Sequence, residues 1–117
     1  MKNEESRIQQ ACVRWFRLQY PRLVLFAIPN GGNRNAVTGA ILKSEGVLAG
    51  VSDLILLYPR GAYHGLCIEM KTPKGRQQES QKQFQRQAEA AGYKYIICRS
   101  LDSFVAEIRE YLHPSTA

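Results

Sequence analysis

Asp53-Leu54-Ile55-Leu56-Leu57-Tyr58 and, soon after it, Ile68-Glu69-Met70-Lys71 are the stretches that decide the fold of this chain. Both lie in apolar runs typical of strands, and the turn-like stretch Pro-Arg-Gly-Ala-Tyr separates them. In an antiparallel hairpin, paired residues lie equally far from the centre of the turn. Asp53 and Glu69 are equally far from Gly61, so we expect them to face each other with Cβ atoms about 5 Å apart.

The hairpin also carries a lysine beside the two carboxylates. Side chains alternate in direction along a strand, so Lys71 is expected on the same face as Glu69, with Met70 on the opposite face. Such a set on neighbouring strands is what a magnesium-dependent phosphodiester hydrolase needs. The alternative is a polar pair at a sheet end beside a surface lysine. Two like charges directly opposite destabilise a sheet unless a cation lies between them, which favours the metal site.

Composition indicates one globular domain. The chain has 117 residues, of which 44% are hydrophobic, and this is typical of a folded domain with one core. No apolar run approaches the roughly 20 residues that span a bilayer, and the polar first residues give no secretory signal. We therefore expect a soluble cytoplasmic protein without a membrane partner. The cysteines lie in apolar patterns without a Cys-x-x-Cys pair, which favours buried thiols.

The net charge of +6 suggests a polyanionic partner, and its distribution is more informative than its size. Lys71, Lys74 and Arg76 follow the second carboxylate closely in the sequence. A protein that bound nucleic acid only by electrostatics would have little reason to place carboxylates among these basic residues.

Hydrophobic periodicity predicts the element order αβαββαβα. Helices are expected over 4–19, 36–45 and 76–91 and after a capping Ser100, and strands over 23–28, 53–58, 64–71 and 93–98. The run 23–28 is almost uninterruptedly apolar, as expected of a strand buried on both faces. A crossover helix over 76–91 favours parallel pairing of the last two strands. We therefore expect an α/β fold with a mixed central sheet flanked by helices.

At these residues the chain resembles the PD-(D/E)XK nuclease superfamily, and within it the VRR-NUC family. The core of the resemblance is Gly50-Val51-Ser52-Asp53 followed by Ile68-Glu69-Met70-Lys71. The family usually has proline before the aspartate, where this chain has Ser52. Supporting matches are Glu5-x-x-Ile8-Gln9, Pro29-Asn30-Gly31-Gly32-x-Arg34, Leu42-Lys43-x-x-Gly46-Val47-x-x-Gly50 and Gln81.

The resemblance implies a single VRR-NUC nuclease domain over 1–117 with a restriction-endonuclease-like fold. It also implies a Mg²⁺- or Mn²⁺-dependent endonuclease that cuts branched or structured DNA in replication, recombination or repair. The small size resembles the stand-alone viral and bacterial members, which implies the cytoplasm of a bacterial cell or a phage-infected host. Stand-alone members resemble Holliday junction resolvases, so a homodimer is implied. The alternatives are a non-catalytic DNA-binding module that keeps the fold, and a dimeric structural protein of a phage or mobile element.

The resemblance assigns roles to individual residues. The implied metal ligands are Asp53, Glu69, the carbonyl of Met70, and Glu5. Lys71 would hold the attacking water and help to deprotonate it. For Glu5 the alternatives are its neighbour Glu4 as the ligand, or a charge that only favours the helix N-terminus.

Further residues are expected to contact water or DNA. Gln81 could orient the water or a phosphate, or be one of several solvated glutamines on its helix. Contacts with the DNA backbone are expected from Asn30, Gly31, Gly32, Arg34, Lys74 and Arg76. The glycines would also serve a tight turn, and the basic side chains could simply be solvated. Phosphate contacts carry no sequence code, so we expect recognition of DNA structure rather than sequence.

Overall fold

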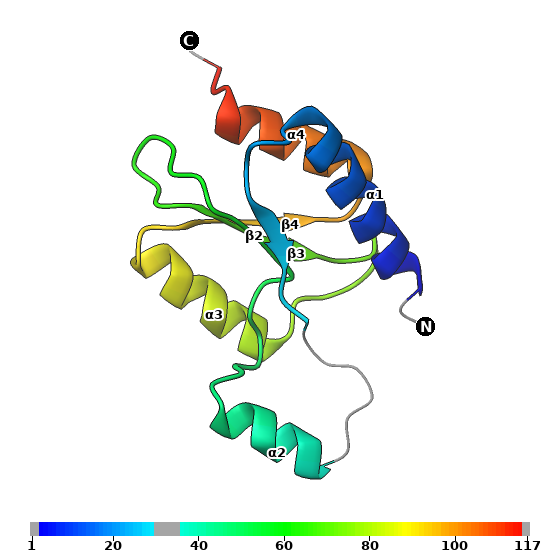
Figure 1. The fold of residues 1–117 in the computed structure, drawn as a ribbon, viewed down its shortest axis with the longest axis vertical. Coiled ribbons are helices and arrows are strands. Elements are labelled where there is room, and N and C mark those ends of the chain that lie inside the picture. Colours follow the sequence, from blue (N-terminus) through cyan, green and yellow to red (C-terminus); the bar gives the residue numbers. More distant parts are fainter. Residues whose placement is uncertain (1–2, 30–35, 116–117) are drawn as a thin grey trace.

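The structure, a computed structural model, describes residues 3–29 and 36–115. Its elements follow the predicted order (Figure 1). The helices are α1 (Asn3–Gln19), α2 (Ala36–Ser44), α3 (Glu79–Ala90) and α4 (Leu101–Leu112), and the strands are β1 (Leu25–Ala27), β2 (Leu54–Leu56), β3 (Leu66–Met70) and β4 (Lys94–Cys98). The predicted cap is confirmed, because the Ser100 side chain accepts a hydrogen bond from the Ser103 amide. No helix in the described ranges is long and apolar enough to cross a membrane.

The strands form one mixed sheet in the order β1-β2-β3-β4. β2 and β3 are antiparallel, with Leu54 opposite Ile68. These two residues are equally far from Gly61, so the predicted hairpin register is confirmed. Extending this register by one residue brings Asp53 opposite Glu69. The prediction of parallel pairing between β3 and β4 is also confirmed.

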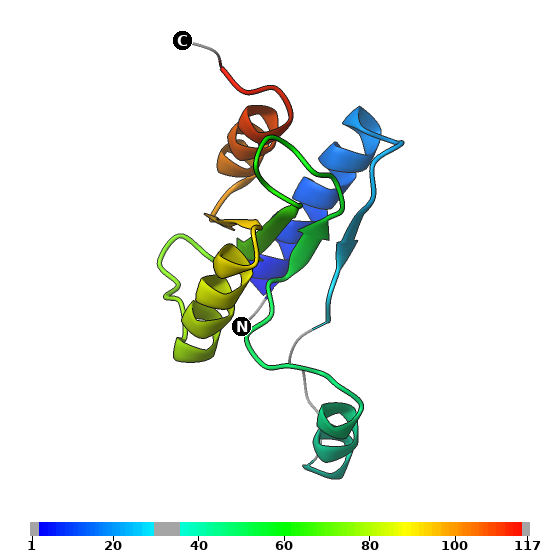
Figure 2. The ribbon, with the colours of Figure 1, turned by 90° about the vertical axis from the view of Figure 1, so that its left-hand side faces the viewer.

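Helices cover both faces of the sheet, with α1 and α4 on one face and α3 on the other (Figure 1 and Figure 2). Phe16 of α1 and Phe104 of α4 are fully buried in the main core, together with Met70 of β3. Cys67 belongs to a smaller cluster on the face covered by α3. Since side chains alternate along β3, Glu69 points to the same face as Cys67. The site therefore lies on the α3 side of the sheet.

The prediction that the run 23–28 forms a strand buried on both faces is wrong. β1 is an edge strand, in which Leu25 is buried while Phe26 and Ala27 are exposed. The helix on that face, α3, packs mainly against β4 at the opposite edge of the sheet. An apolar run has the same appearance in the sequence whether or not a helix covers it.

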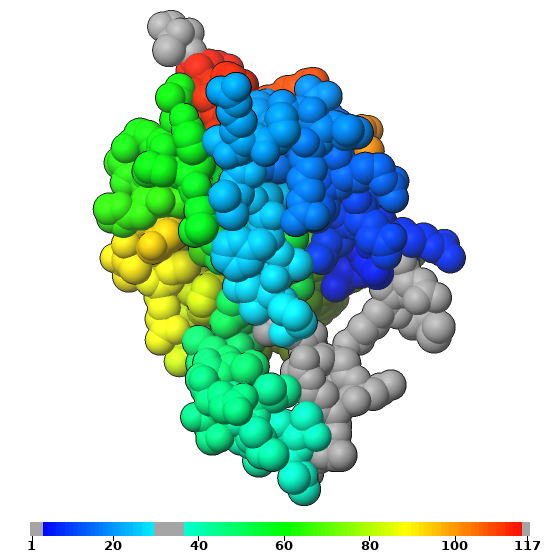
Figure 3. Space-filling model, in the orientation of Figure 1, coloured from blue at the N-terminus to red at the C-terminus, as the bar shows by residue number. Residues whose placement is uncertain are grey.

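α2 stands apart from the sheet and forms a protrusion at one end of the molecule (Figure 1 and Figure 3). Val37 and Ile41, one helical turn apart, are 70% and 52% exposed. The opposite side of this helix, with Gly39, Leu42 and Lys43, lines a groove that reaches the two strands of the hairpin. Thus one face of α2 belongs to the site and its other face is apolar and open.

Candidate active site

Asp53 is held between two neighbouring strands just before β2 begins. Its carbonyl oxygen accepts a hydrogen bond from the Ile28 amide at 2.9 Å, and its Oδ2 accepts one from the Met70 amide at 2.6 Å. The preceding turn needs a glycine, because Gly50 has a φ of 89° and a Cβ there would collide with the backbone carbonyl group of Ser80. These contacts fix where Asp53 enters the sheet.

The carboxyl group of Glu69 is fully buried, and its two oxygens have different surroundings. Oε1 accepts hydrogen bonds from the Tyr95 hydroxyl at 2.7 Å and from Nε2 of Gln77 at 2.9 Å. Oε2 is also buried but accepts no hydrogen bond from any described residue. A buried polar atom without a partner is destabilising. Oε2 is therefore a position at which a cation fits.

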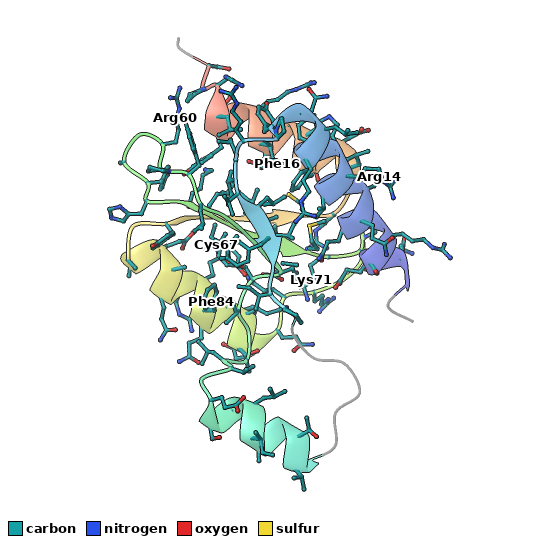
Figure 4. All side chains as sticks on the ribbon, viewed as in Figure 1. Arg14, Phe16, Arg60, Cys67, Lys71 and Phe84 are labelled. Carbon is teal, nitrogen blue, oxygen red and sulfur yellow. The ribbon has the colours of Figure 1, made fainter. Side chains whose placement is uncertain are left out.

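Lys71 lies at the end of β3 with its ammonium group directed at the same carboxyl group. Its Nζ is 3.7 Å from Oε2 of Glu69, which is an ion-pair distance but too long for a good hydrogen bond. The lysine is only 8% exposed. Figure 4 shows it at the lower end of the sheet, between α1 and α3. The prediction that Lys71 and Glu69 share one face is confirmed.

Arg99 fixes the loop that follows Lys71. Its Nη1 donates hydrogen bonds to the carbonyl oxygens of Thr72 at 2.8 Å and Gly75 at 2.6 Å. Hydrogen bonds from a charged donor are stronger than neutral ones. The same loop carries Lys74, which is exposed, and Arg76 follows it, also exposed.

The electrostatics of Asp53 reflect its burial. Burial raises the pKa of the Asp53 carboxyl above its ordinary value, and the hydrogen bond from the Met70 amide lowers it again. The nearby charge of Glu69 also raises this pKa, while that of Lys71 lowers it. Carboxyl groups that share a site disfavour each other's charge. A cation between them would compensate for both the burial and the repulsion.

A groove of about 740 Å³ opens from Asp53 and Lys71 towards α2 and α3. Glu5 of α1 lines this groove and is half-buried, whereas its neighbour Glu4 is exposed and does not line it. Of the two glutamates, Glu5 is therefore the one beside the site. Gln81 also lines the groove, but its Oε1 accepts a hydrogen bond from the Gln78 amide at 2.7 Å. This bond is part of the α3 capping box.

The carboxyl groups of Asp53 and Glu69 suit a hard divalent cation. Both supply oxygen atoms, which Mg²⁺ and Mn²⁺ prefer. Among residues 3–29 and 36–115, no three His, Cys, Asp or Glu side chains form a group that could hold a metal. An ion held by two carboxylates would keep several waters, as Mg²⁺ usually does. Glu5 lines the groove without completing such a group.

Sequence reasoning missed the two residues that hold Oε1 of Glu69. Tyr95 is buried, and a buried tyrosine hydroxyl usually finds a hydrogen-bond partner, so the alternation of the 93–98 strand could have indicated it. Gln77 stands among several glutamines, and nothing in that run distinguishes it. The predicted DNA contacts Asn30, Gly31, Gly32 and Arg34 lie outside the described residues.

Comparison with known proteins agrees with this architecture. The family model of the VRR-NUC domain matches residues 3–102. A solved structure described as a VRR_NUC domain protein superimposes with a TM-score of 0.78 and 26% sequence identity, over 93% of this chain and 88% of that chain. No curated protein matches the chain.

Proposed function

The chain belongs to the VRR-NUC family, which is of nuclease type, and we propose that it is a metal-dependent endonuclease acting on branched or structured DNA. The observation that carries the proposal is the buried Oε2 of Glu69, which accepts no hydrogen bond from the described residues and lies next to the Asp53 register position and at ion-pair distance from Lys71. A cation at this position would satisfy a buried acceptor and reduce the repulsion between two carboxylates.

In this proposal, Asp53, Glu69 and the Met70 carbonyl hold Mg²⁺ or Mn²⁺, with Glu5 as a further ligand from α1. When bound, such an ion lowers the pKa of a water molecule and polarises a phosphoryl oxygen. Lys71 holds the attacking water and stabilises the charge that develops on the phosphate. The water oxygen attacks phosphorus in line and the bond to the 3′ oxygen breaks, leaving 5′-phosphate and 3′-hydroxyl ends.

The groove beside the site is proposed to bind the DNA backbone. Lys43 on the groove wall and the exposed Lys74 and Arg76 supply positive charge for phosphates. Gln81 can donate from Nε2, because its Oε1 is engaged in the helix cap. None of these contacts reads a base edge, which favours recognition of DNA shape over sequence.

The test is cleavage by the wild-type protein. We expect a four-way junction to be nicked in the presence of Mg²⁺ or Mn²⁺, and a linear duplex of the same sequence to be cut much more slowly. Chelation with EDTA should stop the reaction, and gel analysis of end-labelled strands measures it. Junction binding without metal-dependent cleavage would favour the non-catalytic module. Absence of both Mn²⁺ binding and DNA binding would favour the structural protein.

We further propose that the active form is a homodimer associated through α2. Support comes from Val37 and Ile41, which are exposed one helical turn apart on α2, since removing adjacent apolar side chains from water favours association. α2 carries a single charged residue, Lys43, on its opposite side. The same patch on two copies can therefore pack about a two-fold axis without placing like charges together.

Replacing Ile41 with glutamate is expected to convert the dimer to a monomer, because it would bury two like charges in the interface. Sedimentation velocity measures the mass of each variant. Leu18→Glu is the matched control, since Leu18 is an exposed apolar residue on α1, away from this face. A wild-type monomer, or an Ile41→Glu dimer of unchanged strength, would contradict the proposal.

A further inference from the structure

The two oxygens of the Glu69 carboxyl group make different contacts with the surrounding protein. Oε1 receives two hydrogen bonds, from the Tyr95 hydroxyl and from Nε2 of Gln77. A carboxylate oxygen has two lone pairs in the plane of the group, so Oε1 is saturated. Oε2 receives none from the described residues and lies 3.7 Å from Nζ of Lys71.

We propose that Gln77 and Tyr95 are positioning residues that orient the Glu69 carboxyl group for the divalent cation. By occupying Oε1 they fix the rotation of the carboxyl group and leave Oε2 as its single metal-binding atom. The inference rests on the proposed metal-dependent function and assigns it two residues outside the family motif. Groups that hydrogen-bond to a metal ligand commonly control metal affinity in this way.

Tyr95 reaches Glu69 because of the parallel register of β3 and β4. Cys67 pairs with Tyr95 and Glu69 pairs with Ile97, so Tyr95 is the diagonal neighbour of Glu69 on the same face. Its ring lies 6.2 Å from that of Phe84 of α3, centre to centre, and the residue is 7% exposed. The ring is therefore held by packing, and the hydroxyl has one defined direction.

Gln77 is held by a second acceptor on the other side of its amide group. Its Nε2 also donates to Oε1 of Gln85 at 2.8 Å, and Nε2 of Gln85 in turn donates to Oε2 of Glu89 at 3.3 Å. Both partners of the Gln77 nitrogen are acceptors, which determines the orientation of its amide. The middle and the last turn of α3 are thus connected by hydrogen bonds to the proposed metal ligand.

The experiment measures Mn²⁺ binding directly, by calorimetry and by the electron paramagnetic resonance signal of free Mn²⁺. The variants are Tyr95→Phe and Gln77→Leu, each of which removes a donor and keeps most of the side-chain volume. The matched controls are Tyr93→Phe, just before β4, and Gln87→Leu on α3, since no hydrogen bond joins either residue to Glu69. Each test variant is expected to weaken Mn²⁺ binding by about 10- to 100-fold, and each control to leave it unchanged.

Cleavage kinetics separate positioning from a purely structural role. If the two residues orient the ligand, the half-saturating Mn²⁺ concentration rises by the same factor as the dissociation constant, and kcat at saturating Mn²⁺ returns towards that of the wild type. A structural role would instead lower the melting temperature and kcat without moving the Mn²⁺ dependence. Tyr95→Phe keeps the packed ring, so it carries the test even if Gln77→Leu folds poorly.

The outcomes distinguish this inference from the function on which it rests. Wild-type Mn²⁺ affinity in both test variants would overturn the positioning role and leave the nuclease proposal intact. Failure of the wild-type protein itself to bind Mn²⁺ would overturn both. Weaker Mn²⁺ binding in the test variants alone, with the controls unchanged, would establish the role.

Discussion

Replacing Lys71 with alanine is expected to lower the rate of metal-dependent junction cleavage by about 10²- to 10³-fold. The lysine is 8% exposed, and its ammonium group lies 3.7 Å from Oε2 of Glu69. A positive charge fixed in this way stabilises developing negative charge without reorganising as the reaction proceeds. Because one lysine among many basic residues contributes little to the overall attraction for DNA, junction affinity should change far less than the rate.

The same substitution makes a second, independent prediction for metal binding. Removing a positive charge next to the proposed cation position should leave Mn²⁺ binding intact or strengthen it. Single-turnover cleavage, junction binding in a gel-shift assay and Mn²⁺ calorimetry measure the three quantities separately. Lys82→Ala is the control, since Lys82 is an exposed lysine of α3 with no part in the proposed site. Equal cleavage rates for wild type and Lys71→Ala, with folding intact, would remove Lys71 from the mechanism.

The central part of the site could be predicted because strands obey simple rules of geometry. Alternation and hairpin symmetry together bring Asp53 opposite Glu69 and Lys71 on the face of Glu69, without any knowledge of the rest of the fold. The same arguments depend on neighbouring residues only. They therefore predicted the register of the hairpin correctly. The Ser100 cap was also predicted correctly, because a helix cap depends on neighbouring residues.

The features of the site and fold that could not be predicted depend on contacts between segments distant in the sequence, which local patterns do not encode. Tyr95 meets Glu69 only through the register of a parallel pair joined by a helix, and Gln77 meets it only because α3 returns over the sheet. The exposure of Phe26 likewise depends on which strands α3 covers. Ser52 stands where the family usually has a proline. Its buried hydroxyl donates a hydrogen bond to the Leu54 carbonyl at 3.3 Å, which restrains the backbone at the start of β2.

Asp53→Asn is expected to abolish Mn²⁺ binding and cleavage, yet to raise the melting temperature of the metal-free protein. The asparagine Oδ1 can still accept the hydrogen bond from the Met70 amide, so the local structure should persist. It lacks the charge that a divalent cation requires of this ligand. It also lacks the charge that burial and Glu69 disfavour. Function and stability should therefore change in opposite directions.

The raised pKa of Asp53 determines how the stability gained by Asp53→Asn depends on pH. The pKa of Asp53 is raised in the folded protein above its ordinary value of 3.8, so ionisation of this carboxyl opposes folding. Below pH 3.8 the group is protonated in both the folded and unfolded states, and the aspartate has no disadvantage. As the pH rises above the ordinary pKa, the unfolded chain ionises at Asp53 before the folded protein does, so the free energy of unfolding of the wild type falls relative to that of Asp53→Asn. This loss is complete once the pH is above the raised pKa. The stabilisation by asparagine should consequently be present at pH 7 and vanish below pH 3.8.

Thermal unfolding in EDTA, at pH 7 and below pH 3.8, measures the difference in melting temperature between Asp53→Asn and the wild type. At pH 7, excess Mn²⁺ should make the wild type the more stable of the two. A ligand that binds only the folded state stabilises it, so the wild-type protein should gain stability from Mn²⁺ and Asp53→Asn should not. Asp102→Asn serves as the control, because Asp102 is exposed in the first turn of α4. If metal-free Asp53→Asn melts at a lower temperature than the wild type at pH 7, the ionised Asp53 carboxylate stabilises the fold by itself. Its burial would then be no support for a cation site.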